Sequence, residues 1–149
     1  MGDALSLSES GLKLVCFPVS DSGDLGQGFS ESVIKRFPIY RELYEMAKRK
    51  TELISGNNVY IKPQDDVVLV SMVCQRGKRT RQNYSNLDLT SLKECMIKVV
   101  QQFKDRNPTI ICPDFANFRA TGIKHDGVQK LILAEWVEKG IIVNIYRRV

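Results

Sequence analysis

Residues 14–38 read LVCFPVSDSGDLGQGFSESVIKRFP and decide the fold, because they hold a strand, a loop and a helix in that order. The apolar run Leu12 to Val19 has the length of a buried strand. Ser20 to Gly28 form a polar, glycine-bearing loop, and residues 29–37, FSESVIKRF, predict a helix. Continuous apolar strands that alternate with helices are typical of parallel sheets covered on both faces.

The remaining chain continues this alternation. Pro38 starts a second helix across residues 39–50, in which Ile39, Leu43 and Met46 share one apolar face. The clearest amphipathic helix spans residues 87–103, where apolar residues recur at spacings of three and four. The other expected elements are strands at 59–62, 67–74, 109–112 and 141–146, a turn at 63–66, and a helix at 128–139 that Gly140 ends. The sequence therefore predicts one three-layer α/β/α domain, residues 1–149, with a mainly parallel central sheet.

The composition excludes several classes of protein. The 149 residues suit one domain, and no apolar run approaches the roughly 20 residues that cross a bilayer, so we expect no membrane partner. The net charge of +5 attracts anions in general, without choosing among phosphate esters, nucleic acid and acidic surfaces. The start of the chain lacks the basic and apolar regions of a secretory signal, which favours the cytoplasm or nucleus. We also expect a monomer.

The cysteines favour a reducing compartment. Cys16, Cys74, Cys95 and Cys112 are widely spaced, and none forms a CxxC pair, so we expect buried free thiols. A zinc site would need close pairs of ligands and would have one histidine, His125, to help. The sequence predicts no metal and no cofactor.

Ligands of such sheets bind outside the carboxyl ends of the strands, which points to the loops Ser20–Gly28, Gln75–Asn83 and Pro113–Gly127. Glycines in the first loop let backbone N–H groups approach a phosphate, and the N-terminus of the next helix adds partial positive charge. The loop is not a Walker A motif, because no Gly-Lys-Ser/Thr follows it, and it lacks the full spacing of a dinucleotide fingerprint.

The stretch at 14–38 resembles the first ligand loop of macro domains, the ADP-ribose-binding modules. Residues 82–87, QNYSNL, look like the Thr-Tyr-x-Asn-Leu motif that opens the long helix in the branch related to the terminal ADP-ribose protein glycohydrolase. A strand ending in IICP, a second glycine-containing loop, a helix and a final strand follow in the family's order. The resemblance covers nearly the whole chain and implies binding of ADP-ribose or of ADP-ribosylated protein or nucleic acid.

The resemblance also implies roles for individual residues. The carboxylate of Asp3 would accept a hydrogen bond from the adenine amino group, although a frayed terminus is an equal alternative. Ser20 falls where the glycohydrolase branch has a serine near the distal ribose. The residues that would surround the phosphates and the distal ribose are Gly26, Gln27, Gly28 and Phe29 in the first loop, Thr121, Gly122 and Ile123 in a second phosphate-binding turn, and Asn117 and Phe118 before it.

The sequence departs from the family at two kinds of position. Family members usually carry a strand before the Gly-Asp pair that Gly2-Asp3 would match, so either the sheet lacks an edge strand or that match is accidental. The glycohydrolase branch has a lysine nucleophile where this chain has Gln75, followed by Arg76, and neither can form a Schiff base. The branch's catalytic aspartate aligns with Ala120, Thr121 or Lys124. We therefore expect the lysine-dependent mechanism to be absent.

Two alternatives to simple binding stay open. A hydrolase acting on ADP-ribosyl groups or on ADP-ribose phosphate esters would use Ser20 together with Asp21, Asp24 or His125 to activate water. Asp126 is not expected to orient His125, because adjacent residues of an extended loop point apart. The second alternative is a nucleic-acid-binding module, in which RNA, DNA or poly(ADP-ribose) contacts a basic loop beside Tyr84, formed by Arg76, Lys78, Arg79 and Arg81. A solvated charged loop explains the same four cations.

Overall fold

The computed structural model describes residues 7–23, 25, 29–50, 53–77, 86–115 and 122–146. Its elements follow one another as β1 (Lys13–Ser20), α1 (Phe29–Arg36), α2 (Ile39–Lys50), β2 (Asn58–Gln64), β3 (Val67–Gln75), α3 (Leu89–Phe103), β4 (Thr109–Pro113), α4 (Gly122–Glu135) and β5 (Ile142–Tyr146). Short 3-10 turns, Lys104–Arg106 and Val137–Lys139, follow α3 and α4. No helix in the described ranges is long and apolar enough to cross a membrane.

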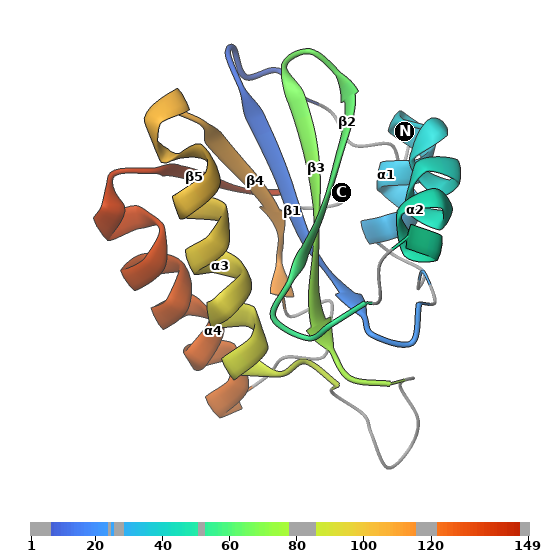
Figure 1. Ribbon diagram of the computed structural model, residues 1–149. Helices are drawn as coiled ribbons and strands as arrows, with labels where there is room; N and C mark the ends of the chain where they lie inside the picture. The colour runs from blue at the N-terminus through green and yellow to red at the C-terminus, as the bar shows by residue number, and fades with distance from the viewer. Residues whose placement is uncertain are drawn as a thin grey trace.

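The five strands form one sheet in the order β2-β3-β1-β4-β5. β1 pairs in parallel with β3 and β4, β4 pairs in parallel with β5, and β2 is antiparallel to β3. Every residue of β1 and β3 is buried, as continuous apolar strands in a covered sheet require. Helices α1 and α2 lie on one face and α3 and α4 on the other (Figure 1). The predicted three-layer α/β/α architecture with a mainly parallel sheet is therefore confirmed.

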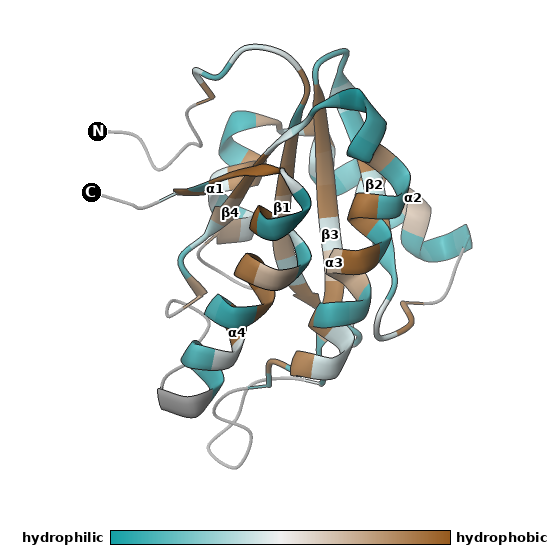
Figure 2. Ribbon diagram, turned by 90° about the vertical axis from the view of Figure 1, so that its left-hand side faces the viewer, coloured by the Kyte–Doolittle hydropathy of each residue, from teal (hydrophilic) through white to brown (hydrophobic). Residues whose placement is uncertain are grey.

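The core has one layer on each side of the sheet. The layer under α3 and α4 holds all four cysteines and Trp136, whose indole N–H donates to the carbonyl of Met96 at 3.2 Å. All four cysteines are buried and free, as predicted. Figure 2 shows the hydrophobic colour concentrated on the strands and hydrophilic residues on the outer faces of the helices. Apolar burial on both faces therefore fixes the sheet in the middle of the domain.

The predicted buried face of α2 is wrong. Ile39 and Met46 are 49% and 43% exposed, whereas Tyr40 and Tyr44 are fully buried. The Tyr40 ring packs edge-on against Phe17 in β1, with 5.7 Å between ring centroids. The Tyr40 hydroxyl also shares a 2.7 Å hydrogen bond with the Ser71 hydroxyl in β3. Because Ser71 in the sheet satisfies the Tyr40 hydroxyl, a tyrosine can occupy the buried face of α2, where the sequence pattern predicts aliphatic side chains.

The predicted start of the last helix is also wrong. α4 begins at Gly122 and not at Val128, so His125 and Asp126 are helical and do not lie on an extended loop. The sequence suggests a loop at Gly127, but this glycine lies within α4, where its lack of a side chain allows close helix packing. A Cβ atom at Gly127 would lie 2.7 Å from Cδ1 of Leu89 in α3. The glycine therefore lets α3 and α4 approach closely, and this contact outweighs its low helix propensity.

The predicted turn at residues 63–66 is shorter than expected. Pro63 and Gln64 belong to β2, and only Asp65 and Asp66 form the turn. A proline is tolerated here because β2 is an edge strand, and the register shifts between Ile61 and Gln64. The last 3-10 turn ends at Gly140, which has a left-handed φ of 86° and supplies the predicted stop.

Candidate functional site

The carboxyl ends of the three central strands meet at one edge of the sheet, the lower edge in Figure 1. β1, β3 and β4 end there at Ser20, Gln75 and Pro113. Ser20 pairs with Gln75 in the register, and the backbone N–H of Asp21 donates to the Gln75 carbonyl at 2.9 Å. The sequence placed its three candidate ligand loops after these strands, and the structure brings the beginnings of the first two into direct contact.

A cluster of hydrogen bonds, which we call the Gly77 clasp, ties these two loops together through Ser20, Asp21, Gly77 and Asn86. The Ser20 hydroxyl donates to the Gly77 carbonyl at 2.7 Å, and the side-chain N–H of Asn86 donates to the same carbonyl at 2.8 Å. The Gly77 N–H donates to Oδ1 of Asp21 at 2.8 Å. Gly77 has a φ of 65°, a conformation that glycine adopts without strain.

The clasp includes Ser20 and Asp21, two side chains that the sequence predicts as candidate catalytic groups. Besides donating to Gly77, the Ser20 hydroxyl accepts a 3.1 Å hydrogen bond from the Ser22 N–H. The exposed carboxylate of Asp21 accepts the Gly77 N–H. Both side chains therefore orient the loops.

Gln75 is buried and anchors the segment that leads into α3. Its side-chain N–H donates to Oδ1 of Asn86 at 3.2 Å, and its backbone bridges to Leu87. The side-chain amide of Gln75, the residue that the resemblance aligns with a lysine of the glycohydrolase branch, is thus already hydrogen-bonded. A glutamine side chain supplies neither a nucleophilic amine nor a base.

Arg76, the first cation of the basic loop, points toward the start of α3. Its guanidinium forms a 3.2 Å ion pair with Asp88, the residue that caps α3. Hydrogen bonding by the Ser91 side chain, with a smaller contribution from Arg76, holds the pKa of Asp88 below its usual value. The remaining cations of that loop, Lys78, Arg79 and Arg81, lie outside the described residues.

His125 lies in a different cavity from the clasp. This cavity of about 190 Å³ is formed by α4 and the ends of β4 and β5, and neither Ser20 nor Asp21 lines it. Nε2 of His125 is 3.2 Å from the side-chain nitrogen of Gln129, one helical turn away, while Nδ1 is buried without a partner in the described part of the chain. The structure therefore does not bring together the three side chains that the sequence grouped as catalytic.

Phe29 is a core residue. Its ring is 7% exposed and packs against Phe17 and Tyr146, with centroid distances of 5.4 and 5.7 Å. Since Phe29 is the first residue of α1, its backbone remains at the helix start while its side chain faces the sheet. A contact between Phe29 and a ligand would therefore be made by its backbone.

The other candidate residues fall into two groups. Gly122 and Ile123 are the first two residues of α4, so the predicted second phosphate-binding turn continues directly into a helix. The candidates that lie outside the described residues are Asp3, Asp24, Gly26, Gln27, Gly28, Asn117, Phe118, Ala120 and Thr121. Among the described residues, no cluster of three or more histidine, cysteine, aspartate or glutamate side chains could hold a metal.

The sequence did not predict three residues that lie near the carboxyl edge of the sheet. Asn86 and Gly77 hold the clasp, and Lys48 in α2 reaches the first loop, where its ammonium donates to the Gly23 carbonyl at 3.3 Å. Asn86 lies inside the QNYSNL motif, which was the available signal for it. No local pattern marks Gly77 or Lys48, because their partners lie in distant segments.

No protein-family model matches the sequence, and no curated protein matches it. Solved structures do match. A macrodomain protein from Streptomyces coelicolor superimposes with a TM-score of 0.84 at 21% identity, covering 99% of this chain and 96% of that one. The macrodomain of Mycobacterium tuberculosis DarG gives a TM-score of 0.70 at 15% identity, covering 98% of this chain and 95% of that one.

A third match contains a ligand. Thermosipho africanus DarTG, solved in complex with ADP-ribose, superimposes with a TM-score of 0.62 at 18% identity, covering 93% of this chain and 39% of that one. The fold described above thus recurs in proteins whose sequences differ widely from this one. This chain is a protein of macrodomain fold.

Proposed function

We propose that this chain binds ADP-ribose, free or attached to a macromolecule, at the carboxyl edge of its sheet. The observation that carries the proposal is the pairing of Ser20 with Gln75, which joins the first ligand loop to the segment after β3. Helices α1 and α4 also begin at this edge of the sheet. The complex of Thermosipho africanus DarTG with ADP-ribose supports the choice of ligand, since that protein shares the fold.

The chemistry of this edge suits a diphosphate. Backbone N–H groups at the starts of α1 and α4 are free of intrahelical partners and carry partial positive charge, which favours phosphate oxygens. In the proposed complex, residues 26–29 and 121–123 donate to the two phosphates, and Asp3 accepts from the adenine amino group. The Gly77 clasp holds the beginning of the first loop in place before the ligand arrives, which lowers the entropy lost on binding.

Binding without lysine-dependent hydrolysis is the favoured form of the proposal. Gln75 occupies the strand end that carries lysine in the glycohydrolase branch, and its amide is engaged by Asn86. Ser20 and Asp21 are likewise engaged by Gly77. His125 lies in a separate cavity and does not assist them.

Isothermal titration with ADP-ribose tests the binding site. We expect a dissociation constant in the micromolar range, which Gly28→Glu weakens at least tenfold because a carboxylate enters a phosphate-binding loop. The matched control is Ser10→Glu, which adds the same charge at an exposed position beyond the opposite end of β1. Equal affinity of both variants for ADP-ribose, or no binding by the parent chain, contradicts the proposal.

Incubation with ADP-ribosylated protein or DNA separates a binding module from a hydrolase. We expect no released ADP-ribose. Asp21→Asn keeps an oxygen that accepts the Gly77 N–H while removing the carboxylate as a base, so release that occurs in the parent and stops in this variant would establish hydrolysis. Binding of RNA in place of ADP-ribose, with a steep salt dependence reduced by Arg79→Ala, would establish the nucleic-acid alternative.

A further inference from the structure

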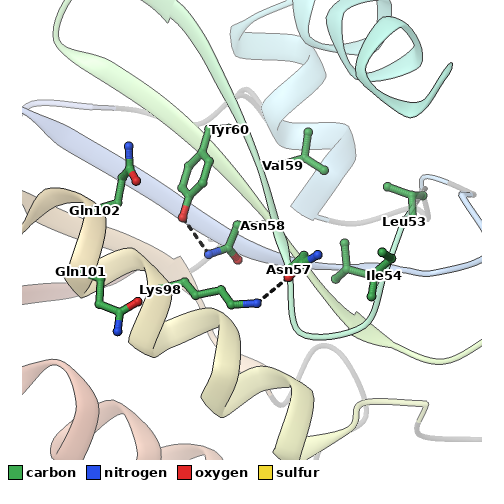
Figure 3. A pocket seen from close by; sticks show the side chains of 10 residues that line it. Leu53, Ile54, Asn57, Asn58, Val59, Tyr60, Lys98, Gln101 and Gln102 are labelled. Carbon is green, nitrogen blue, oxygen red and sulfur yellow. Dashed lines mark hydrogen bonds between the residues drawn. The ribbon is translucent and has the colours of Figure 1, made fainter. Parts of the chain in front are cut away.

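A second cavity, of about 400 Å³, lies where the edge strand β2 faces α3 (Figure 3). None of the residues assigned to the ADP-ribose site lines it. Its volume falls within the range of about 300–1,000 Å³ that is usual for ligand pockets. The cavity is therefore a separate candidate site.

The lining of this cavity is amide-rich and carries one positive charge. Four side-chain amides, one tyrosine ring and several aliphatic groups surround it, and its lining residues include no carboxylate. The charge belongs to Lys98, whose ammonium donates to the Gly56 carbonyl at 2.9 Å and to Oδ1 of Asn57. Both of these acceptors are neutral, so neither of them cancels the positive charge of Lys98.

Asn58 has an acceptor that no described residue uses. Its side-chain nitrogen donates to the Tyr60 hydroxyl at 3.0 Å and to the Cys95 carbonyl at 3.0 Å, and the carbonyl partner fixes which end of the amide is nitrogen. Its Oδ1 is buried without a partner in the described residues. A buried acceptor of this kind favours a ligand that donates a hydrogen bond.

In the described part of the chain, no strand pairs with the outer side of β2 next to the cavity. β2 is the first strand in the sheet order, and the Val73 N–H donates to the Asn57 carbonyl at 2.9 Å. In an antiparallel ladder the hydrogen-bonded residues alternate, so the backbone N–H and C=O groups of Asn58 and Tyr60 point away from β3. Two backbone donors and two acceptors thus face outward beside the cavity.

The far end of β2 is protected from pairing. Lys62 is exposed, Pro63 lacks an N–H group, and the register shifts between Ile61 and Gln64. Each of these features discourages the addition of another strand. The edge that can accept a partner is therefore limited to residues 58–60, the part that adjoins the cavity.

The geometry points to a docking site for an extended, acidic peptide segment of a partner protein. The segment pairs with residues 58–60 as an additional strand, its main chain supplies the hydrogen bonds, and alternate side chains enter the cavity. An acidic side chain lies near Lys98, and a donor of the segment reaches Oδ1 of Asn58. This site is independent of ADP-ribose binding.

The test uses the full ¹⁵N-labelled chain and three synthetic peptides. The acidic probe Ac-Thr-Glu-Val-Glu-Val-Thr-NH2 should shift the backbone amide signals of Asn58 and Tyr60 and slow their hydrogen exchange. The second probe, Ac-Thr-Glu-Pro-Glu-Val-Thr-NH2, lacks one main-chain N–H and should bind at least tenfold more weakly. The third, with lysine at both glutamate positions, should also bind more weakly because Lys98 repels it.

Charge variants at Gln101, an exposed residue of the lining, test the same site from the protein side. Gln101→Glu should weaken binding of the acidic probe and Gln101→Lys should strengthen it, each by about two- to fivefold, as expected for exposed charges. Both variants should keep the parent's backbone amide signals outside the cavity, which shows that they are folded.

Three outcomes overturn the inference. They are an absence of shifts at Asn58 and Tyr60 at millimolar acidic peptide, equal affinity for all three probes, and shifts at these two amides caused by ADP-ribose in place of peptide. The last result would assign the cavity to a nucleotide.

Discussion

Ser20 and Gln75 lie side by side because the register between β1 and β3 slips by one residue just before them. Val19 pairs with Val73, and Ser20 then pairs with Gln75, so Cys74 is the extra residue. Such bulges redirect the side chains that follow them and are common beside functional sites. Here the slip places both strand ends within reach of Gly77 and Asn86. The Gly77 clasp therefore depends on this irregularity.

We predict that Asn86→Ala destabilises the chain by about 1–3 kcal/mol, because it removes one of the two hydrogen bonds to the Gly77 carbonyl and takes the Asn86 acceptor from the buried side-chain N–H of Gln75. Urea unfolding followed by the fluorescence of Trp136, the only tryptophan in the sequence, measures the change. Gln102→Ala, at an exposed site on α3, serves as the control and should change stability by less than about 0.5 kcal/mol. Equal effects of the two substitutions would show that the clasp contributes nothing.

A double-mutant cycle on Tyr40 and Ser71 should reveal coupling. Their buried hydroxyls share one hydrogen bond, so Tyr40→Phe or Ser71→Ala alone leaves a polar group unsatisfied and should cost about 1–2 kcal/mol. The double variant should lose less than the sum of the single variants, with a coupling of about 0.5–1.5 kcal/mol by urea unfolding. Strict additivity would mean that the hydrogen bond does not stabilise the fold.

The stability of the chain should fall at acidic pH through Asp66. A hydrogen bond from the buried Lys13 ammonium, followed by one from Gln64, lowers the pKa of Asp66 from 3.8 to about 2. Because the folded-state pKa is depressed, this contribution is present above pH 4 and is lost as the pH falls from about 4 to about 2.

Asp66→Asn should therefore remove this part of the acid dependence. Its unfolding free energy should be lower than that of the parent above pH 4, and the difference should shrink toward pH 2. Asp65→Asn changes the neighbouring exposed carboxylate of the same turn and should retain the parent's profile. Parallel profiles for the parent and Asp66→Asn would contradict the assignment.

The cysteines should be unreactive in the folded chain. Burial raises the pKa of Cys95 and of Cys112 to about 12, and it raises the pKa of Cys16 and of Cys74 well above the usual value. A thiol of pKa about 12 is only about 10⁻⁴ ionised at pH 8, and the thiolate is the reactive form. A thiol-reactive chromogenic disulfide should report no thiol in native protein and four in guanidinium. Fast reaction of one native thiol would place it at the surface.

The fold was predictable because its strongest determinants are local. The nearly continuous apolar runs of β1 and β3 and the regular spacing of apolar residues along α3 predict these elements directly. The predictions were wrong where contacts between distant segments determine which residues are buried and where a helix begins. Ser71 makes Tyr40 acceptable in the core, and Leu89 uses the space left by Gly127, and neither partner is close in sequence.

The candidate site was predictable only in outline. Parallel strands implied that the loops after them converge, and the structure confirms this for the segments after β1 and β3. The residues that join these segments could not be inferred, because Ser20 and Gly77 are 57 residues apart in the chain. A helix carries His125 into a cavity that Ser20 and Asp21 do not line, and the catalytic roles of these three side chains stay predictions.

The place of β1 in the sheet has a consequence for synthesis on the ribosome. Among the described strands, β1 is the first to be made and lies at the centre of the finished sheet, yet its two neighbours, β3 and β4, are translated later. Pairings between distant segments form slowly, whereas the β2–β3 hairpin can form as soon as it emerges. The apolar segment KLVCFPVS therefore stays unpaired until β3 has been translated, and during that interval it is an exposed apolar segment of the nascent chain that a chaperone can bind.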